Sequence, residues 1–221
     1  MSYHPQSDIL QAYVEGSLDE VTAFTIAIHL ESCPQCKRKV ALAEQKCGEA
    51  LSHAPIEQTP DNFDDIFAQI VTLEQNSEPF RAPQQAKPIT VNNKTFMLPR
   101  ALGRFSDQIG DWKSYGGKVF SAPIEIADSC RVNLMYIAED VQIPQHTHKG
   151  IESTLVLHGG FSDEDGHYEV GDYLVKDASI KHSPFTKPGE DCLCLAVLTE
   201  PMIFTQGVAR LFNMFGKGMY P

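Results

Sequence analysis

The sequence predicts an α + β chain of two domains, a helical bundle followed by a small β-barrel or jelly-roll. Apolar residues recur at helical spacing through residues 1–75. Residues 76–87 contain two prolines and two glutamines and have little that could pack, as in a linker. From residue 88 to 200 the chain divides into short β-like runs separated by Gly, Pro and Asp. We therefore expect domains at 1–75 and 88–200, a linker at 76–87 and a C-terminal tail at 201–221.

Local signals predict four helices in the first part. Ser7 is placed to cap a short helix that reaches Val14, and residues 17–20 (SLDE) have capping-box form before an apolar stretch that runs to about Glu31. A third helix is expected to begin with Cys33 as its N-cap and Pro34 in its first turn, because proline is tolerated there. Residues 59–71 predict a fourth helix, with Phe, Ile and Val at helical spacing.

The second part is expected to be β-structure. Runs rich in branched and aromatic residues predict strands at 131–137, 153–158, 167–170, 172–175 and 192–198. The sequence Asp-Glu-Asp-Gly at 163–166 predicts a hairpin turn.

Composition restricts the class of function. The net charge is −11 and the isoelectric point is near 5.1, which opposes direct nucleic-acid binding because phosphate contacts need clustered Lys and Arg. Residues 1–75 hold 12 acidic against 4 basic residues, so this part presents either a solvated acidic face or a surface for a basic partner. The apolar runs are shorter than the roughly 18 residues of a membrane span, and the first residues lack the pattern of a signal peptide. We expect a cytoplasmic protein without a membrane segment.

A His-x3-Cys-x2-Cys motif at His29, Cys33 and Cys36 predicts a structural zinc site. The two thiols form a short knuckle that reaches one ion, and His29 is four residues away around a helix end. His4 is the preferred fourth ligand and His53 the weaker candidate. A redox pair is the alternative, but it lacks the βαβ context of such motifs. Cys47 and Cys130 stand alone and are expected to be buried as small apolar residues.

A second group of metal-type residues lies in the β-part. His146 and His148 share a strand face, Glu152 follows after a turn, and His182 comes thirty positions later. Three imidazoles and one carboxylate suit a divalent metal, with Zn foremost and Mn, Fe or Ni as alternatives. His158 and His167 are expected not to be ligands.

These motifs resemble two known families. His4 with His29, Cys33 and Cys36 in a short acidic helical domain resembles the bacterial zinc-binding anti-sigma fold, and the second part resembles the cupin fold. His146, His148, Glu152 and Gly159 fit the first cupin motif and His182 fits the ligand of the second, whereas residues 177–182 and Thr186 depart from its flanking pattern. In this order the two domains resemble the ChrR-type anti-sigma factors.

That resemblance implies a non-enzymatic regulator. Its N-terminal domain would bind and inhibit an extracytoplasmic-function (ECF) sigma factor, and its cupin domain would sense singlet oxygen or organic peroxides and release the sigma factor. Cys192 and Cys194 share a strand face and are either redox-sensing groups near the metal or buried core residues. The alternative function is a dioxygenase-like cupin metalloenzyme with an accessory helical domain.

Overall fold

A computed structural model describes residues 2–55, 62–74, 87–127, 130–207, 209, 210 and 213. Helices occupy the first part and strands the second, as predicted, and among the described residues no helix has the length and apolarity that crossing a bilayer requires. The helices are α1 Ser7–Glu15, α2 Glu20–Ser32, α3 Pro34–Ser52, α4 Phe63–Thr72, α5 Arg100–Gly103 and the 3₁₀ turn η1 Ser106–Gln108. The strands are β1 Pro88–Val91, β2 Lys94–Met97, β3 Lys113–Tyr115, β4 Val119–Ile124, β5 Arg131–Ile137, β6 His146–His148, β7 Glu152–Asp163, β8 Gly166–Glu169, β9 Tyr173–Lys176, β10 Cys192–Leu198 and β11 Met202–Phe204.

Helix caps differ from the predicted ones in two places. Gln6 is the N-cap of α1, so Ser7 already lies within the helix. Asp19 caps α2 in place of Ser17, because its carboxylate accepts hydrogen bonds from the backbone N–H groups of Val21 and Thr22. The prediction for α3 is confirmed, since the Cys33 sulfur accepts from the Cys36 backbone N–H. The proposed start of the fourth helix, Thr59, lies outside the described residues.

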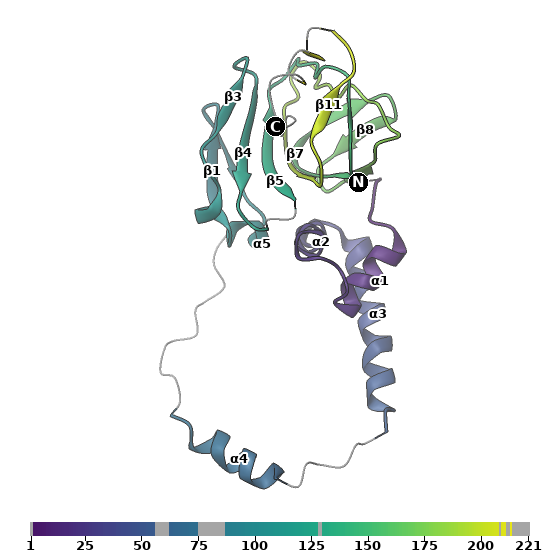
Figure 1. Cartoon of the computed structure of the whole chain (residues 1–221), viewed down its shortest axis with the longest axis vertical. Coiled ribbons are helices and arrows are strands. Elements are labelled where there is room, and N and C mark those ends of the chain that lie inside the picture. Colours follow the sequence, from purple (N-terminus) through teal and green to yellow (C-terminus); the bar gives the residue numbers. More distant parts are fainter. Residues whose placement is uncertain are drawn as a thin grey trace.

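The main sheet has the order β3-β4-β5-β10-β7-β8, with β9 also paired to β7, and all pairings are antiparallel. The predicted strands at 131–137 and 192–198 match β5 and β10. Asp163 and Gly166 pair across the predicted hairpin turn between β7 and β8. Residues 202–204, placed in the tail by the sequence, form β11 (Figure 1). This strand pairs with β6.

The predicted cupin glycine, Gly159, has a positive φ of 62°. A β-carbon at this position would collide with the backbone carbonyl of Asp191, where β10 runs alongside β7. Glycine is therefore required here both for its backbone conformation and for the close approach of the neighbouring chain.

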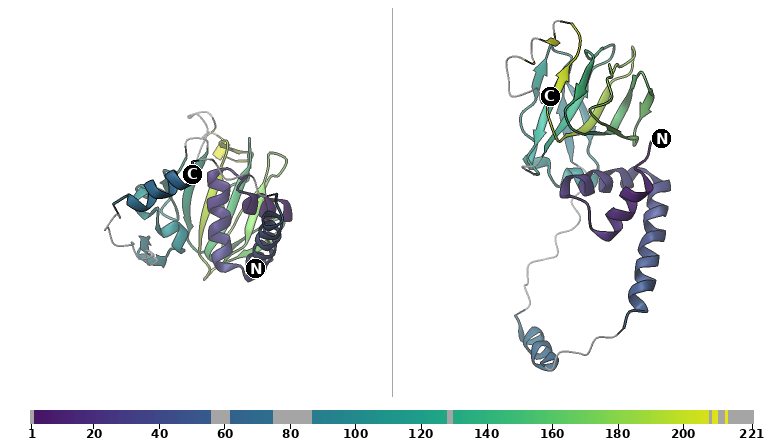
Figure 2. Two further views of the ribbon diagram at one scale, coloured as in Figure 1. Left: turned by 90° about the horizontal axis from the view of Figure 1, so that it is seen from below. Right: turned by 45° about the vertical axis from the view of Figure 1, so that its right-hand side comes forward.

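The helices and the β-domain share one hydrophobic core. α2 lies across the end of the β-domain, α1 lies beside it, and α3 projects away from the sheet (Figures 1 and 2). Leu10 and Ile26 of the helices belong to the same buried cluster as Leu134 and Leu195 of the strands. The Glu31 carboxylate at the end of α2 also accepts from the backbone N–H groups that begin α5, at 2.8 and 2.7 Å. The bundle is thus packed against the β-domain.

Candidate metal centres

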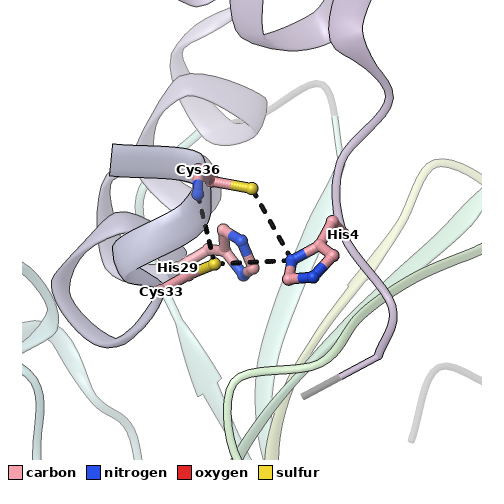
Figure 3. Close-up of side chains that lie close together, drawn as sticks. All are labelled: His4, His29, Cys33 and Cys36. Atoms are coloured by element: carbon pink, nitrogen blue, oxygen red, sulfur yellow. Dashed lines mark hydrogen bonds between the residues drawn. The ribbon is translucent and has the colours of Figure 1, made fainter. Parts of the chain in front are cut away.

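The structure brings together His4, His29, Cys33 and Cys36, which the sequence singled out. Each offers one ligand atom, and these atoms lie within 4.8 Å of one another. His4 Nδ1 lies 3.4 Å from the Cys33 sulfur and 3.6 Å from the Cys36 sulfur (Figure 3). His53, the weaker candidate, is at the exposed end of α3, where its Nδ1 contacts the Glu49 carbonyl at 2.7 Å. Of the two candidates for the fourth ligand, His4 belongs to this cluster and His53 does not.

The local structure explains why these four side chains meet. His29 is in the last turn of α2, while Cys33 and Cys36 lie at and just after the start of α3, so one helix junction supplies three of them. His4 comes from the extended segment before α1 and faces the junction (Figure 3). His29 Nδ1 lies 2.8 Å from the Gly171 carbonyl, which can only accept a hydrogen bond. Its Nε2 is buried without a hydrogen-bond partner, as expected for a ring nitrogen that binds a metal.

Electrostatics at this site also fit a cation. Burial lowers the pKa of His29, which keeps its imidazole neutral and able to ligate. Burial and the neighbouring Cys33 thiol raise the pKa of Cys36 to about 11. Repulsion between the two negative charges disfavours deprotonation of both neighbouring thiols. A divalent ion that binds both thiolates offsets this repulsion. The donor set of two sulfurs and two nitrogens is one that Zn²⁺ prefers in closed tetrahedral sites.

The second predicted group, His146, His148, Glu152 and His182, also converges. All four residues are buried, and their ligand atoms lie within 4.8 Å of one another. His148 Nε2 lies 3.0 Å from the Glu152 carboxylate and 3.4 Å from His182 Nε2. Strand β6 supplies two of the histidines, β7 begins at the glutamate, and the fourth residue bridges to β6.

The protonation states of this cluster suit a divalent metal. Burial, with the nearby His182, lowers the pKa of His146 to about 4, so the ring is neutral at pH 7. The His146 Nδ1 faces the Pro144 carbonyl at 3.0 Å, which leaves Nε2 for a metal. Burial alone would raise the pKa of Glu152, but the His148 hydrogen bond and the nearby imidazoles outweigh it and lower that pKa. Three imidazoles and one carboxylate leave positions open for further ligands on an octahedral ion.

Of the two cysteines of β10, Cys194 lies beside this centre. Both are fully or nearly fully buried, and Cys194 lines a small cavity of about 50 Å³ together with His146, Glu152 and His182. The hydrogen bond to Cys194, together with burial, raises the pKa of Cys192 well above its usual range. This opposes thiolate formation at Cys192.

The remaining histidines and cysteines are elsewhere. His158 faces Asp191 and His167 faces Glu190, each at 3.4 Å, and neither belongs to the two clusters. The expectation that Cys47 is buried is wrong, because it lies on the projecting part of α3 and is exposed. Cys130 is partly buried.

Sequence reasoning missed the groups that orient the ligands. Asp163 Oδ2 lies 3.2 Å from His182 Nδ1, although the sequence indicated only a turn at that position. The Gly171 carbonyl that orients His29 belongs to the β-domain, 142 residues further along the chain. A backbone acceptor so distant in the sequence leaves no pattern that could have predicted it.

Comparison with known proteins agrees with this architecture. Residues 103–201 match the family described as the ChrR cupin-like domain. The predicted resemblance to the ChrR-type anti-sigma factors is confirmed by two further matches. The chain is 28% identical over 214 residues to the anti-sigma-E factor ChrR of Cereibacter sphaeroides, covering 96% of this chain and 97% of that protein. It also matches the crystal structure of Rhodobacter sphaeroides SigE in complex with the anti-sigma ChrR, with a TM-score of 0.67, 25% identity and coverage of 89% of this chain and 98% of that one.

Proposed function

We propose that this protein is an anti-sigma factor that binds and inhibits an ECF sigma factor through its N-terminal domain. The observation that carries the proposal is the similarity along nearly the whole chain to an anti-sigma factor, which includes a structure solved with its sigma factor. Both ligand clusters of the predicted type are present in the order that the resemblance implies. The similarity is to a regulator, and the proposed role is not enzymatic.

Helix α4 supplies the surface best suited to this partner. Phe63, Ile66, Phe67, Ile70 and Val71 recur at helical spacing, and all are between 41% and 62% exposed. The rings of Phe63 and Phe67 stack with centroids 6.4 Å apart. An exposed apolar helix face of this kind is typical of a protein–protein interface. Two acidic residues in the first turn, Asp64 and Asp65, add negative charge that fits a basic partner surface.

The cupin domain is proposed to sense reactive oxygen, such as singlet oxygen or an organic peroxide, and then to release the sigma factor. The cavity beside the metal cluster has a volume of about 50 Å³, whereas pockets for organic ligands typically measure about 300 to 1,000 Å³. Its size therefore favours a small oxidant over the substrate of a dioxygenase. Met135, Met202 and Cys194 line it, and their sulfurs are oxidisable groups.

The proposed cofactors follow from the two donor sets. Zn is proposed at His4, His29, Cys33 and Cys36, where it would fix the junction of α2 and α3. A divalent metal, with Zn foremost and Mn, Fe or Ni as alternatives, is proposed at His146, His148, Glu152 and His182. Because sigma factors act on RNA polymerase, the proposed location is the cytoplasm, with no direct contact to nucleic acid or membrane.

The direct test is affinity purification of the tagged full chain from its native host, with mass spectrometry of the bound proteins and metal analysis of the eluate. We expect one ECF sigma factor in roughly one-to-one ratio, and about one zinc on the thiolate site. A metal-loaded chain that copurifies with no sigma factor would contradict the proposal and favour the cupin enzyme.

A further inference from the structure

The residues just before His4 are anchored in the β-domain. The backbone N–H groups of Ser2 and Tyr3 donate to the Asp172 carboxylate at 2.6 and 3.0 Å. The backbone N–H of Tyr173 donates to the Tyr3 carbonyl at 3.1 Å. His4, the candidate ligand at the N-terminal cluster, is therefore positioned by two hydrogen bonds to the turn between β8 and β9 and by a third from the first residue of β9.

The same turn holds the second histidine of that cluster. The Gly171 carbonyl accepts from His29 Nδ1, while the other carboxylate oxygen of Asp172 accepts from the backbone N–H of Glu169. Residue 171 thus orients the His29 ring, and residue 172 holds the backbone just before His4. A displacement of this turn would move both histidines relative to the two cysteines.

A line of side chains leads from this segment to the other metal cluster. The Tyr3 ring packs edge-on against the Tyr168 ring, with centroids 4.8 Å apart. The Tyr168 hydroxyl, which is buried, donates to Asp163 Oδ1 at 2.8 Å. The other Asp163 oxygen accepts from Lys176 Nζ at 2.8 Å and faces His182 Nδ1 at 3.2 Å. His182 is a candidate ligand of the cupin metal, so contacts run without a gap between the two clusters.

We propose that Asp163, Tyr168 and Tyr3 are positioning residues that couple the cupin metal cluster to the N-terminal His₂Cys₂ cluster. The proposal rests on the proposed function, because it supplies the route by which an event in the cupin domain reaches the sigma-binding domain. With a divalent cation bound, His182 would hold it through Nε2, and its ring would then have one fixed orientation. The fixed ring holds its Nδ1–H against Asp163, and Asp163 in turn holds the Tyr168 hydroxyl. When the His182 ring is not fixed, Asp163 holds the Tyr168 hydroxyl less firmly. The Tyr168 ring, on which Tyr3 packs, then no longer keeps the Tyr3–His4 segment in place.

Thermodynamic linkage gives this coupling a measurable form. If the cupin metal stabilises the N-terminal cluster, loss of that metal must expose the N-terminal thiols to reagents more often. Cys33 and Cys36 are buried, whereas Cys47 on α3 is exposed and serves as an internal reference in the same molecule. Alkylation by N-ethylmaleimide, followed by peptide mass spectrometry, therefore reports on the N-terminal cluster alone.

The experiment compares full-length chains that retain or lack His148, since His148→Ala removes one cupin ligand next to His182 and leaves Asp163, Tyr168 and Tyr3 in place. Each is prepared with native tyrosines, with Tyr168→Phe and with Tyr136→Phe. Tyr136 is the matched control: its hydroxyl is also 2.8 Å from a carboxylate, that of Asp191, and its side chain is equally buried, but it contacts neither cluster. Circular dichroism melts establish that all six proteins fold.

With native tyrosines we expect His148→Ala to raise the alkylation rate of Cys33 and Cys36, relative to Cys47, by about fivefold or more. The increase should persist with Tyr136→Phe and fall below about twofold with Tyr168→Phe, since only the latter breaks the link to Asp163. An unchanged alkylation rate in His148→Ala, or an equal increase in the two tyrosine variants, would overturn the proposal.

This experiment is independent of sigma binding. A chain that binds a sigma factor without the Tyr168-dependent increase would refute the coupling and leave the proposed function standing. A chain that shows the increase but binds no sigma factor would retain the coupling and refute the proposed function.

Discussion

Replacing Phe67 by alanine is expected to weaken sigma-factor binding without weakening the fold. The Phe67 side chain is 57% exposed, so slightly more than half of its surface remains to be buried by a partner. Complete burial of a phenylalanine contributes about 1.5 to 3 kcal/mol, and half of that is roughly 0.8 to 1.5 kcal/mol. Because 1.4 kcal/mol is a factor of ten, the Kd should rise by about 4- to 12-fold.

The double variant Phe63→Ala/Phe67→Ala is expected to raise the Kd for the sigma factor further than Phe67→Ala alone. Phe63 is 50% exposed and stacks on Phe67, so both rings are available to the partner together. Their combined loss, about 1.6 to 3 kcal/mol, corresponds to a rise in Kd of about 15- to 150-fold. Alanine is the strongest helix former, so α4 itself should be retained.

The assay is isothermal titration calorimetry of the purified chain with its sigma factor, together with thermal melts of the free variants. Met97→Ala is the control, because Met97 is 64% exposed on β2, in the β-domain, and should not affect the Kd. A double variant that binds with the wild-type Kd would refute the assignment of this face to sigma binding. An equal loss in Met97→Ala would show that the effect is not specific to α4.

The remaining predictions concern the two clusters and the contacts around them. Cys36→Ser should lose zinc by elemental analysis and lose sigma binding, because metal binding and folding are coupled in small sites; retained zinc and retained binding would contradict this. His148→Ala should make the fraction of sigma factor released independent of oxidant in a pull-down, and a wild-type response would mean that the cupin metal is only structural. Asp19→Ala should lower the free energy of unfolding by about 1 kcal/mol through loss of the α2 cap, measured by urea denaturation with Asp8→Ala as the control; equal stabilities would refute the cap.

Much of the site could be predicted from the sequence because its ligands are close together in the chain. His29, Cys33 and Cys36 lie around one helix junction, and His146, His148 and Glu152 lie within seven residues. Local geometry fixes such groups almost independently of the tertiary fold. The strands at 131–137 and 192–198 were equally predictable, since both are short, mostly apolar runs rich in branched residues, and they lie side by side inside the main sheet.

The contacts between the domains could not be predicted in this way. The Glu31 carboxylate accepts a hydrogen bond from the start of α5, 69 residues away. The Asp172 carboxylate accepts one from the backbone N–H of Ser2, 170 residues away. These contacts follow from how the bundle packs on the sheet, which no local pattern encodes. Two predicted caps were also wrong, by one residue in α1 and by two in α2. In α2, Asp19 and Ser17 are both good N-caps, and the choice depends on where the backbone turns.

Run-off transcription tests the central claim most directly. Core RNA polymerase is combined with each purified ECF sigma factor of the native host, and the full chain is added in increasing amounts. We expect transcription by one sigma factor to be inhibited at a near one-to-one ratio and the other sigma factors to be unaffected. Inhibition should require a much higher ratio with Phe63→Ala/Phe67→Ala. Transcription that continues undiminished with every ECF sigma factor at a severalfold excess of the chain would contradict the assignment as an anti-sigma factor.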